Sequence, residues 1–600
     1  GRQSDIQPTH SAITDGNWLS GIRWIDEKYL GPQSDLPHEI ADNKGRNTYY
    51  FLPFILGLIG LVYQLMRDQR NFSIVMLLFV LTGIALVFYF NTSPNEPRER
   101  DYVYAGSFYA FAIWIGLGVM AVRDALARLL RRDGIAAAGA ATLLCLGVPT
   151  ILAAQNWDDH DRSHRTYARD IGWNYLQSTL PNSIILDYGD NDTFPLWFNQ
   201  EVDGVRTDVR VMNTSYLGGE WYIDEMKTRA NESAPVPLSL PRSKYAYAND
   251  FVPVVDAIDR AVPIGEVMDF IRSEDPRSKR LLTDGTEADY IPTKRIAIPV
   301  NKENAIASGI VREEDRALMV DTVYMNLRKS SLEKNELIIL DLLANFDWKR
   351  PIYTTQPYIM ENLGLLDYLQ YDGFSYRLVP ILTPATDVLD IGRIDPAYTA
   401  PLLLGESDRA FRYGNLADPR VYADYFIQYN LGATHARNAF ARVAKEYLRR
   451  GDTERAMQLL DRGLEVLPTS RIRFTESNTT PYLEAYYAAG ILGAEDADAK
   501  GDALMREYID TLIEYIEYYL RFDGIQADMV NDILSDKYNK LWNLYDLAVY
   551  AGRHEIVNYL NAYLRTLGVT DAELTIPDAP ASEEQPLPQA DAAASAPAAE

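Results

Sequence analysis

Four long apolar segments occupy the first quarter of the chain. They contain no charged residue and cover residues 49–66, 72–90, 102–122 and 134–157. A helix needs about 20 apolar residues to cross the hydrocarbon core of a bilayer. One such segment would also suit a buried helix of a soluble protein. Four in series, each bounded by charged residues, predict a multi-pass membrane protein.

Positive charge in the short connections predicts the orientation of these segments. The arginines of the first and third connections are Arg67, Arg70, Arg123, Arg128, Arg131 and Arg132. Connections rich in arginine and lysine stay on the cytoplasmic side. We therefore expect residues 1–48, the second connection and everything after residue 157 to lie outside the cytoplasm. The predicted location is a bacterial inner membrane, with a large C-terminal region in the periplasm.

After the membrane the pattern changes to short β-like runs that alternate with helical spacing. Residues 165–181 read as a helix, 183–188 as a strand, 195–202 as a helix, and 203–216 contain a second strand. Strand, helix and strand within about 30 residues predict a βαβ unit with parallel strands. The loops after both strands then share the carboxyl edge of the sheet, where open α/β sheets bind ligands.

Residues 158–420 as a whole are therefore expected to form a periplasmic α/β domain. A further β-like run at 352–355 suits the same layer. Residues 230–335 mix proline, charge and short apolar runs, and they give no clear pattern.

The last part of the chain is helical and repetitive. Within 441–468, residues stand where a tetratricopeptide repeat (TPR) requires small, aromatic or helix-ending side chains: Ala444, Tyr447, Gly451, Ala456, Leu460, Gly463 and Pro468. Small residues let two antiparallel helices approach closely. We expect a TPR-like domain over 421–576. Residues 577–600 contain no basic or aromatic residue and predict a disordered tail.

The predicted fold class is thus an α-helical membrane bundle with four spans, an α/β extracytoplasmic domain and an α-helical TPR-like domain. A net charge of −26 argues against nucleic acid as a partner. The single cysteine, Cys145, lies in the fourth apolar segment and rules out an internal disulfide. The chain begins with Gly1 and shows no signal peptide. We therefore expect it to be the C-terminal part of a longer membrane protein.

The stretch ILDYGDNDTFPLWF places Asp187, Asp190 and Asp192 directly after the first predicted strand. Asp190 and Asp192 match an Asp-x-Asp pattern, and two such carboxylates can share one Mg²⁺ or Mn²⁺ ion. A divalent cation is therefore a candidate cofactor. The alternative is a tight turn in which Asp192 or Thr193 caps the next helix. Both interpretations remain open at this stage.

Charged residues also crowd the end of the fourth apolar segment. They are Asp158, Asp159, His160, Asp161 and Arg162, followed by His164 and Arg165. Acids and imidazole could hold a divalent ion, and the arginines could bind a phosphate. The alternative is an interfacial anchor of solvated charges beside Trp157.

The second connection carries Arg98 and Arg100 at the level of the lipid headgroups. Both are candidates for binding the phosphate of a lipid-linked donor. Ordinary salt bridges with Glu96, Glu99 and Asp101 are the alternative. P-loop, Gly-x-Ser-x-Gly, HExxH and CxxC patterns are absent, so the sequence gives no support for the corresponding chemistries.

Several stretches together resemble one family. They are NEPRERDYVYAGSFYAFAIWIGLG, NWDDHDRS, GDNDTFPLWF, EVDGVRTDVRVMNTSYLGGEWYIDEMK, DWKRPIY and GFSYRLVP. Over about residues 1–470 the chain resembles the C-terminal part of the bacterial membrane proteins called domain of unknown function 2723. The resemblance implies a GT-C glycosyltransferase related to protein O-mannosyltransferases.

That resemblance also implies a polyprenyl-phosphate sugar as donor and protein hydroxyl groups as acceptors. The family's acidic base in the first extracytoplasmic loop would lie upstream of Gly1. We therefore assign binding roles here: Arg98 and Arg100 to the donor phosphate, and Asp187, Asp190 and Asp192 to an acceptor or metal. Two alternatives are a non-catalytic, membrane-anchored envelope scaffold that binds protein partners through the repeats and a nucleotide-sugar enzyme that uses Asp190 and Asp192.

Overall fold

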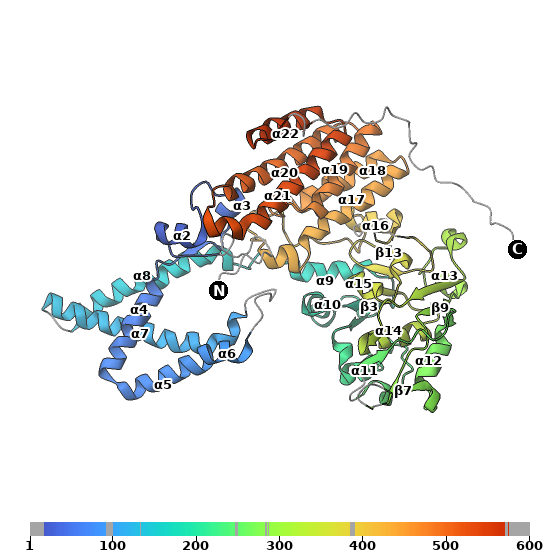
Figure 1. Ribbon diagram of the computed structural model, residues 1–600, viewed down its shortest axis with the longest axis horizontal. Helices are drawn as coiled ribbons and strands as arrows, with labels where there is room; N and C mark the ends of the chain where they lie inside the picture. Colours follow the sequence, from blue (N-terminus) through green and yellow to red (C-terminus); the bar gives the residue numbers. More distant parts are fainter. Residues whose placement is uncertain are drawn as a thin grey trace.

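The computed structural model describes residues 17–91, 100–131, 134–246, 250–281, 285, 287–384, 391–570 and 574. Apolar helices, a mixed α/β region and a C-terminal helical region follow one another along the chain. Figure 1 shows the apolar helices on one side of the molecule and the other two regions together on the opposite side.

Among the described residues, three helical stretches are long and apolar enough to cross a membrane. They are Gln69–Phe90, Asp101–Leu130 and Ile135–His160. The first comprises α5 (Gln69–Phe79), a π-helical turn (Val80–Ile84) and α6 (Ala85–Phe90); the second contains α7 (Ala105–Leu130); the third is α8. The first quarter of the chain therefore carries helices that are long and apolar enough to span a membrane, as the apolar pattern predicts.

The first predicted segment forms a shorter helix than the other three. It is α4, Leu52–Arg67, with 16 residues. Tyr50 and Phe51 have φ angles of 51° and 54°, so the backbone is left-handed where the sequence predicts helix. Because a right-handed α-helix needs negative φ angles, the helix begins only after these two residues.

Close packing joins α4 to α7. A Cβ atom on Gly60 would lie 1.7 Å from the backbone oxygen of Trp114. The Trp114 ring is fully buried, and its indole N–H donates to Gln64 Oε1 over 2.8 Å. Small residues allow this approach of two helices in a membrane, where packing rather than the hydrophobic effect drives association.

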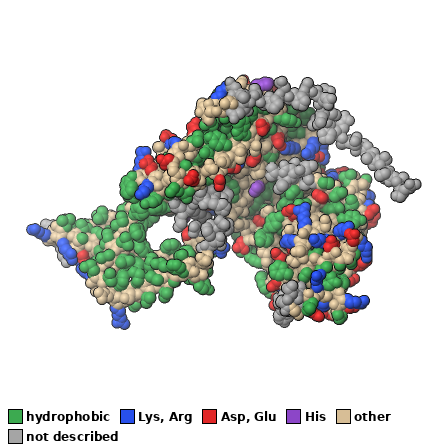
Figure 2. Space-filling view, viewed as in Figure 1, with side chains coloured by type: hydrophobic (Ala, Val, Ile, Leu, Met, Phe, Trp, Pro, Cys, Tyr) green, Lys and Arg blue, Asp and Glu red, His purple; other side chains and the backbone are tan. Residues whose placement is uncertain are grey.

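The third connection is shorter than predicted because α7 continues through Arg123 and Arg128 to Leu130. The residues RDALARLL are mostly good helix formers, which explains the extension. Arg67 at the end of α4 pairs with Asp124 of α7 at 2.8 Å, so these two helix ends lie together. Figure 2 shows hydrophobic side chains over this part of the molecule, with Lys and Arg at the end farthest from the other regions.

A six-stranded mixed sheet forms the centre of the α/β region. Its order is β15 (Arg393–Ile394), β13 (Leu369–Tyr371), β14 (Tyr376–Leu378), β12 (Ile352–Thr354), β3 (Ile184–Asp187) and β4 (Arg210–Asn213). Strand β3 runs parallel to both β4 and β12, which confirms the predicted parallel pair. Ile184, Ile185 and Leu186 are fully buried, because helices and loops cover both faces of this strand.

The helices of the α/β region are short. They are α9 (Tyr167–Ser178), α10 (Asp190–Glu201), α11 (Glu220–Met226), α12 (Ile264–Arg272), α13 (Lys302–Ala307), α14 (Lys334–Asn345), α15 (Tyr358–Glu361) and α16 (Pro396–Leu404).

The stretch without a clear sequence pattern forms small sheets beside α12 and α14. Their strands are β5 (Phe251–Pro253), β6 (Val262–Pro263), β7 (Lys279–Leu281), β8 (Glu287–Asp289), β9 (Arg295–Pro299), β10 (Thr322–Asn326) and β11 (Ser331–Glu333). The largest sheet has the order β10-β9-β6. Strands of two to five residues are too short to give a readable alternation.

The C-terminal region is a stack of helices. They are α17 (Ala433–Arg449), α18 (Thr453–Val466), α19 (Glu476–Ile491), α20 (Ala497–Tyr519), α21 (Gly524–Tyr550) and α22 (His554–Thr566). A Cβ on Gly463 would lie 2.8 Å from the Phe440 ring, so a glycine is required where α18 approaches α17. The predicted disordered tail, 577–600, lies outside the described residues.

The described part of the segment before the apolar helices, residues 17–51, connects two distant parts of the chain. It contains α2 (Arg23–Leu30), α3 (His38–Ala41) and a two-stranded pairing of β1 (Trp18–Leu19) with β2 (Asn47–Thr48). Its α3 contacts α20, where the Tyr515 hydroxyl donates to Glu39 over 2.8 Å. Its β2 contacts α8, where the Thr48 N–H donates to Gln155 over 2.6 Å.

We predict that Gly60→Ala destabilises the protein, because the added methyl group has no room against Trp114. Overpacking of this kind costs about 1–3 kcal/mol. The matched control is Gly116→Ala on α7, where nothing lies within 4 Å of the added atom. Thermal unfolding in detergent should show a lower midpoint for Gly60→Ala only. Equal midpoints for the two variants would contradict this account of the α4–α7 contact.

Candidate functional site

The acidic turn predicted from the sequence joins β3 to α10. Asp187 is the last residue of β3, and its backbone oxygen accepts hydrogen bonds from Thr214 N and Oγ1 at 2.9 and 2.7 Å. Gly189 has a φ angle of 75° and precedes the first helical residue, Asp190. Such an angle strains any residue with a Cβ, which explains the glycine.

The prediction that Asp192 or Thr193 caps α10 is wrong. Gly189 holds the cap position, and no side chain accepts a capping hydrogen bond there. Thr193 instead donates from its hydroxyl to the Gly189 oxygen over 2.7 Å. Asp190 and Asp192 both stand in the first turn of α10, where negative charge is favoured by the helix dipole.

The three aspartates of this turn lie in different environments. Asp187 is fully buried, and neither of its carboxylate oxygens has a hydrogen-bond partner among the described residues. Asp190 is exposed and accepts from the Tyr216 hydroxyl over 3.2 Å. Asp192 accepts from Thr355 Oγ1 at 2.8 Å and from Gln356 Nε2 at 3.3 Å. Within the part of the chain described, no three His, Cys, Asp or Glu side chains are grouped to hold a metal ion.

Burial controls the ionisation of two of these groups. It raises the pKa of Asp187 to about 8, and the nearby Asp192 carboxylate adds to this shift. Burial also raises the pKa of Asp192, although the hydrogen bonds from Thr355 and Gln356 oppose the change. The buried carboxyl group of Asp187 is therefore mainly protonated, and so uncharged, at neutral pH.

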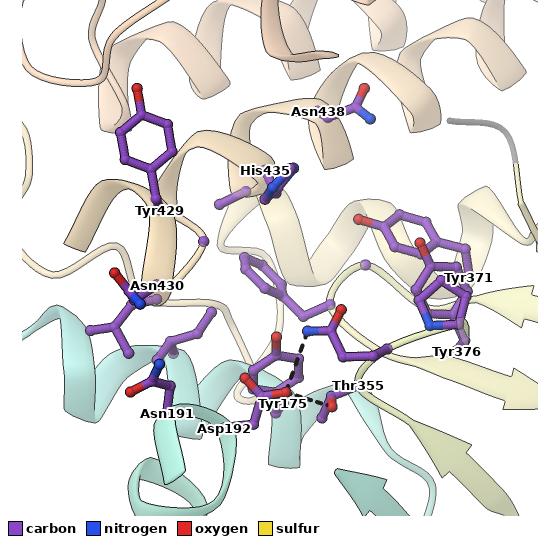
Figure 3. A pocket seen from close by; sticks show the side chains of 18 of the residues that line it. Tyr175, Asn191, Asp192, Thr355, Tyr371, Tyr376, Tyr429, Asn430, His435 and Asn438 are labelled. Atoms are coloured by element: carbon purple, nitrogen blue, oxygen red, sulfur yellow. Dashed lines mark hydrogen bonds between the residues drawn. The ribbon is translucent and has the colours of Figure 1, made fainter. Parts of the chain in front are cut away.

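Asp192 faces a pocket of about 410 Å³ between the sheet and the C-terminal helices. This volume is within the range of small-molecule sites. Figure 3 shows Asp192 and Thr355 at the bottom of the pocket and His435 of α17 above them, with Tyr371 and Tyr376 on the right. The pocket thus lies at the carboxyl edge of β3 and β12, where the sequence predicts ligand binding.

The pocket combines aromatic rings with hydrogen-bonding groups. Burial raises the pKa of Tyr371, so its phenol stays protonated. The Arg442 guanidinium lies over the Tyr371 ring at 4.2 Å and donates to the Ile391 oxygen over 2.6 Å. Desolvation lowers the pKa of His435, which keeps the imidazole neutral at neutral pH. Aromatic rings, phenols, several side-chain amides and one carboxylate suit a neutral, hydroxyl-rich or peptide ligand.

The structure describes one of the two arginines that the sequence predicts for phosphate binding. Arg98 lies outside the described residues. Arg100 is exposed just before the helical stretch Asp101–Leu130 and does not line the pocket. Their role at a donor phosphate stays a prediction.

The charged cluster at the end of α8 is spread around the helix. Helix α8 continues to His160, and successive helical residues point about 100° apart. Asp159 accepts from Asn47 at 3.2 Å and lies 2.8 Å from His160 Nδ1. Asp158, Asp161 and Arg162 are exposed. The cluster therefore supports the contact with the N-terminal segment through Asp159, and phosphate or metal binding by it stays a prediction.

Several pocket residues were missed by the sequence-based prediction. Thr355 follows the predicted strand at 352–355, so its place at the carboxyl edge could have been inferred. Tyr376 lies within GFSYRLVP, which the sequence analysis used only as a resemblance. His435 and Arg442 lie in a helix that the sequence assigns to the repeat domain, and no local signal links them to the sheet.

Comparison with protein families gives a match to the α/β region. Residues 168–398 match the family model described as TMEM260-associated domain 2. This range begins in α9, includes all six strands of the central sheet and ends in α16. It contains Asp187, Asp190 and Asp192 but neither the membrane helices nor α17. No curated protein and no solved structure matches the chain.

We predict that Asp187 makes stability fall as pH rises. Its native pKa of about 8 exceeds the unfolded value of about 3.9, so between these values the native state holds a proton that the unfolded state has lost. The contribution of Asp187 to the free energy of unfolding is fully present below about pH 4. It falls by roughly 1 kcal/mol per pH unit as pH rises toward 8. Asp187→Asn, which stays neutral, should remove this slope.

Denaturant unfolding between pH 4 and pH 8 checks this prediction. Asp187→Asn should gain stability relative to the unmodified protein as pH rises. The exposed Asp190→Asn is the matched control, and its curve should run parallel to that of the unmodified protein. Parallel curves for Asp187→Asn as well would show that the Asp187 carboxyl group is not the cause.

Proposed function

We propose that this chain is the acceptor-binding part of a membrane glycosyltransferase that transfers a mannose-like sugar from a polyprenyl-phosphate donor to protein hydroxyl groups. The observation that carries the proposal is the match of residues 168–398 to a domain associated with TMEM260, a family of protein O-mannosyltransferase-like membrane proteins. The matched region follows directly on membrane-spanning helices, as a lipid-linked donor requires. The resemblance to domain of unknown function 2723 supports the same reaction class.

In this proposal the Asp192 pocket binds the acceptor. Asp192 accepts hydrogen bonds from Thr355 and Gln356, which leaves lone pairs for a ligand hydroxyl or amide N–H. Tyr371 and Tyr376 offer ring faces and phenol groups in the same pocket. A divalent cation is less well supported at this place than an acceptor, because these neighbours are neutral and Asp192 is the only carboxylate lining the pocket.

Arg98 and Arg100 are proposed to bind the donor phosphate at the membrane surface. Planar guanidinium groups match phosphate oxygens in pairs, and a leaving lipid phosphate needs positive charge for stabilisation. The connection that carries them follows α6 and precedes α7. The base that activates the acceptor hydroxyl is proposed to lie outside this chain, in a preceding loop.

We also propose that α4 crosses the membrane as a fourth span, which precedes the three longer ones in the chain. The regions after α8 are proposed to be periplasmic. Sixteen helical residues extend about 24 Å, somewhat less than the roughly 30 Å hydrocarbon core. Tyr49, Tyr50 and Phe51 precede the helix and can supply the aromatic belt at its outer end. The arginine-rich helix ends, held together by Arg67 and Asp124, favour the cytoplasm on the opposite side.

The C-terminal helices are proposed to resemble TPRs and to shape the acceptor site. Their first helix, α17, supplies His435 and Arg442 to the pocket, and α20 holds the N-terminal segment through Tyr515. Deleting this region would therefore disturb both the pocket and the membrane helices. Point variants are the better test between an enzyme and a scaffold that only binds protein partners.

We predict that Asp192→Asn weakens acceptor use. Loss of a hydrogen bond to a charged group costs about 1.5–3 kcal/mol, so KM for an acceptor peptide should rise roughly tenfold or more, while KM for the donor is unchanged. The matched control is Asp190→Asn, which removes one exposed acid two residues away and should leave both constants unchanged. Sugar transfer from a polyprenyl-phosphate donor, measured with the protein from its complete reading frame, checks this. An unchanged KM for the acceptor would remove Asp192 from the site, and the lack of any transfer would favour the scaffold.

A further inference from the structure

An unusual row of exposed apolar side chains lies along α10. Phe194, Phe198 and Val202 are 50%, 43% and 67% exposed. The first two lie four residues apart on α10, and Val202 directly follows the helix at the same spacing, so all three lie on one face. The opposite face is buried through Leu196 and Asn199. An exposed apolar patch of this kind marks a surface that contacts a protein or a membrane.

A groove beside this row enlarges the apolar surface. It has a volume of about 490 Å³ and lies between α9, α10 and the π-helical turn Phe426–Asn430. Phe194 and Phe198 line it together with Phe426 and Leu431. The groove is therefore bounded by aromatic and aliphatic groups from three separate elements.

The chain holds this face close to the membrane. Helix α8 ends at His160 and α9 begins at Tyr167, so six residues connect them, which can span roughly 22 Å when extended. The connection is shorter than this, because the Arg165 N–H donates to the Arg162 oxygen over 3.2 Å. Arg165 also pairs with Asp424 at 2.8 Å, which fixes the connection against the residues before α17.

Tight packing then fixes α10 on α9. A Cβ on Gly172 of α9 would lie 2.3 Å from the Pro195 oxygen of α10. The Asn199 side chain donates to the Arg169 oxygen over 2.8 Å. In Figure 1, α9 and α10 lie on the side of the α/β region that faces the membrane helices, whereas β9 and α13 lie on the opposite side.

We propose that the face formed by Phe194, Phe198 and Val202 docks on the bilayer surface, with the two phenylalanine rings at the level of the lipid headgroups and the upper acyl chains. Helices that lie in this interface bury an aromatic and aliphatic face by a few ångströms. Charge does not drive the contact, because both arginines that line the groove are paired: Arg165 with Asp424 at 2.8 Å and Arg169 with Asp203 at 2.7 Å. The docking therefore depends on apolar burial and holds the Asp192 end of α10 at a fixed height above the membrane.

Site-directed fluorescence on the whole chain in vesicles tests this proposal. Cys145→Ala removes the native cysteine, and Phe198→Cys or Val202→Cys then carries an environment-sensitive label. The vesicles contain phosphatidylcholine and phosphatidylglycerol with a nitroxide quencher on the headgroup. The matched control is Tyr324→Cys, which is 57% exposed on β10 beside β9. Unchanged thermal unfolding shows that each labelled variant is folded.

The expected result is a blue-shifted label at 198 and 202 that the headgroup nitroxide quenches several-fold more strongly than the label at 324. Quenching at 198 and 202 no stronger than at 324 would overturn the proposal. A blue-shifted but unquenched label would also overturn it, because protein rather than lipid would then cover the face. These outcomes do not depend on sugar transfer, so they are separate from a failure of the proposed function.

Discussion

The parallel alignment of β3 with β4 and β12 is the constraint on which the rest of the α/β region depends. Parallel strands end at the same edge, so Asp187 of β3, Asn213 of β4 and the residues after β12 are brought together. Because β3 is covered on both faces, its last residue is buried even though it is an aspartate. The chain must then turn sharply out of the core, and Gly189 allows this turn with its left-handed backbone. Helix α10 can start at once, and its first turn carries Asp192 to Thr355.

The pocket is completed by parts that are distant in sequence. Asp192 and Thr355 are 163 residues apart, and α17 adds His435 and Arg442 from beyond the matched family domain. Arg442 bonds to the Ile391 oxygen and covers the Tyr371 ring, so the sheet and the C-terminal helices share one buried boundary. Hydrogen bonds to a buried guanidinium are costly to break, so this boundary holds the two regions in a fixed relation. The pocket between them therefore has a defined shape.

The sequence predicts the parts of this structure that rest on local patterns. The apolar segments, the parallel strands β3 and β4 and the place of the acidic turn follow from periodicity and from the turn residues themselves. The predictions fail where a backbone angle determines the first residue of a helix. Gly189, and not Asp192 or Thr193, holds the cap position of α10, and α4 begins only after the left-handed Phe51. They also fail where local propensity extends an element, as in α7 beyond Val122. The contributions of His435 and Arg442 could not be predicted, because they depend on how a separate helical region packs on the sheet.

The geometry of α10 links three requirements within one short helix. Its first turn brings Asp192 to the pocket, its inner face packs on the sheet and on α9, and its outer face exposes Phe194 and Phe198. Gly172 removes the side chain that would separate α9 from α10, so a shift of one helix must move the other. Since α9 follows α8 after six residues, and Arg165 of this connection pairs with Asp424, the end of α8 is linked to Asp192 through a short anchored connection and two close-packed helices. The proposed acceptor site needs this property, because a donor sugar on a lipid phosphate can be reached only at a set distance from the bilayer.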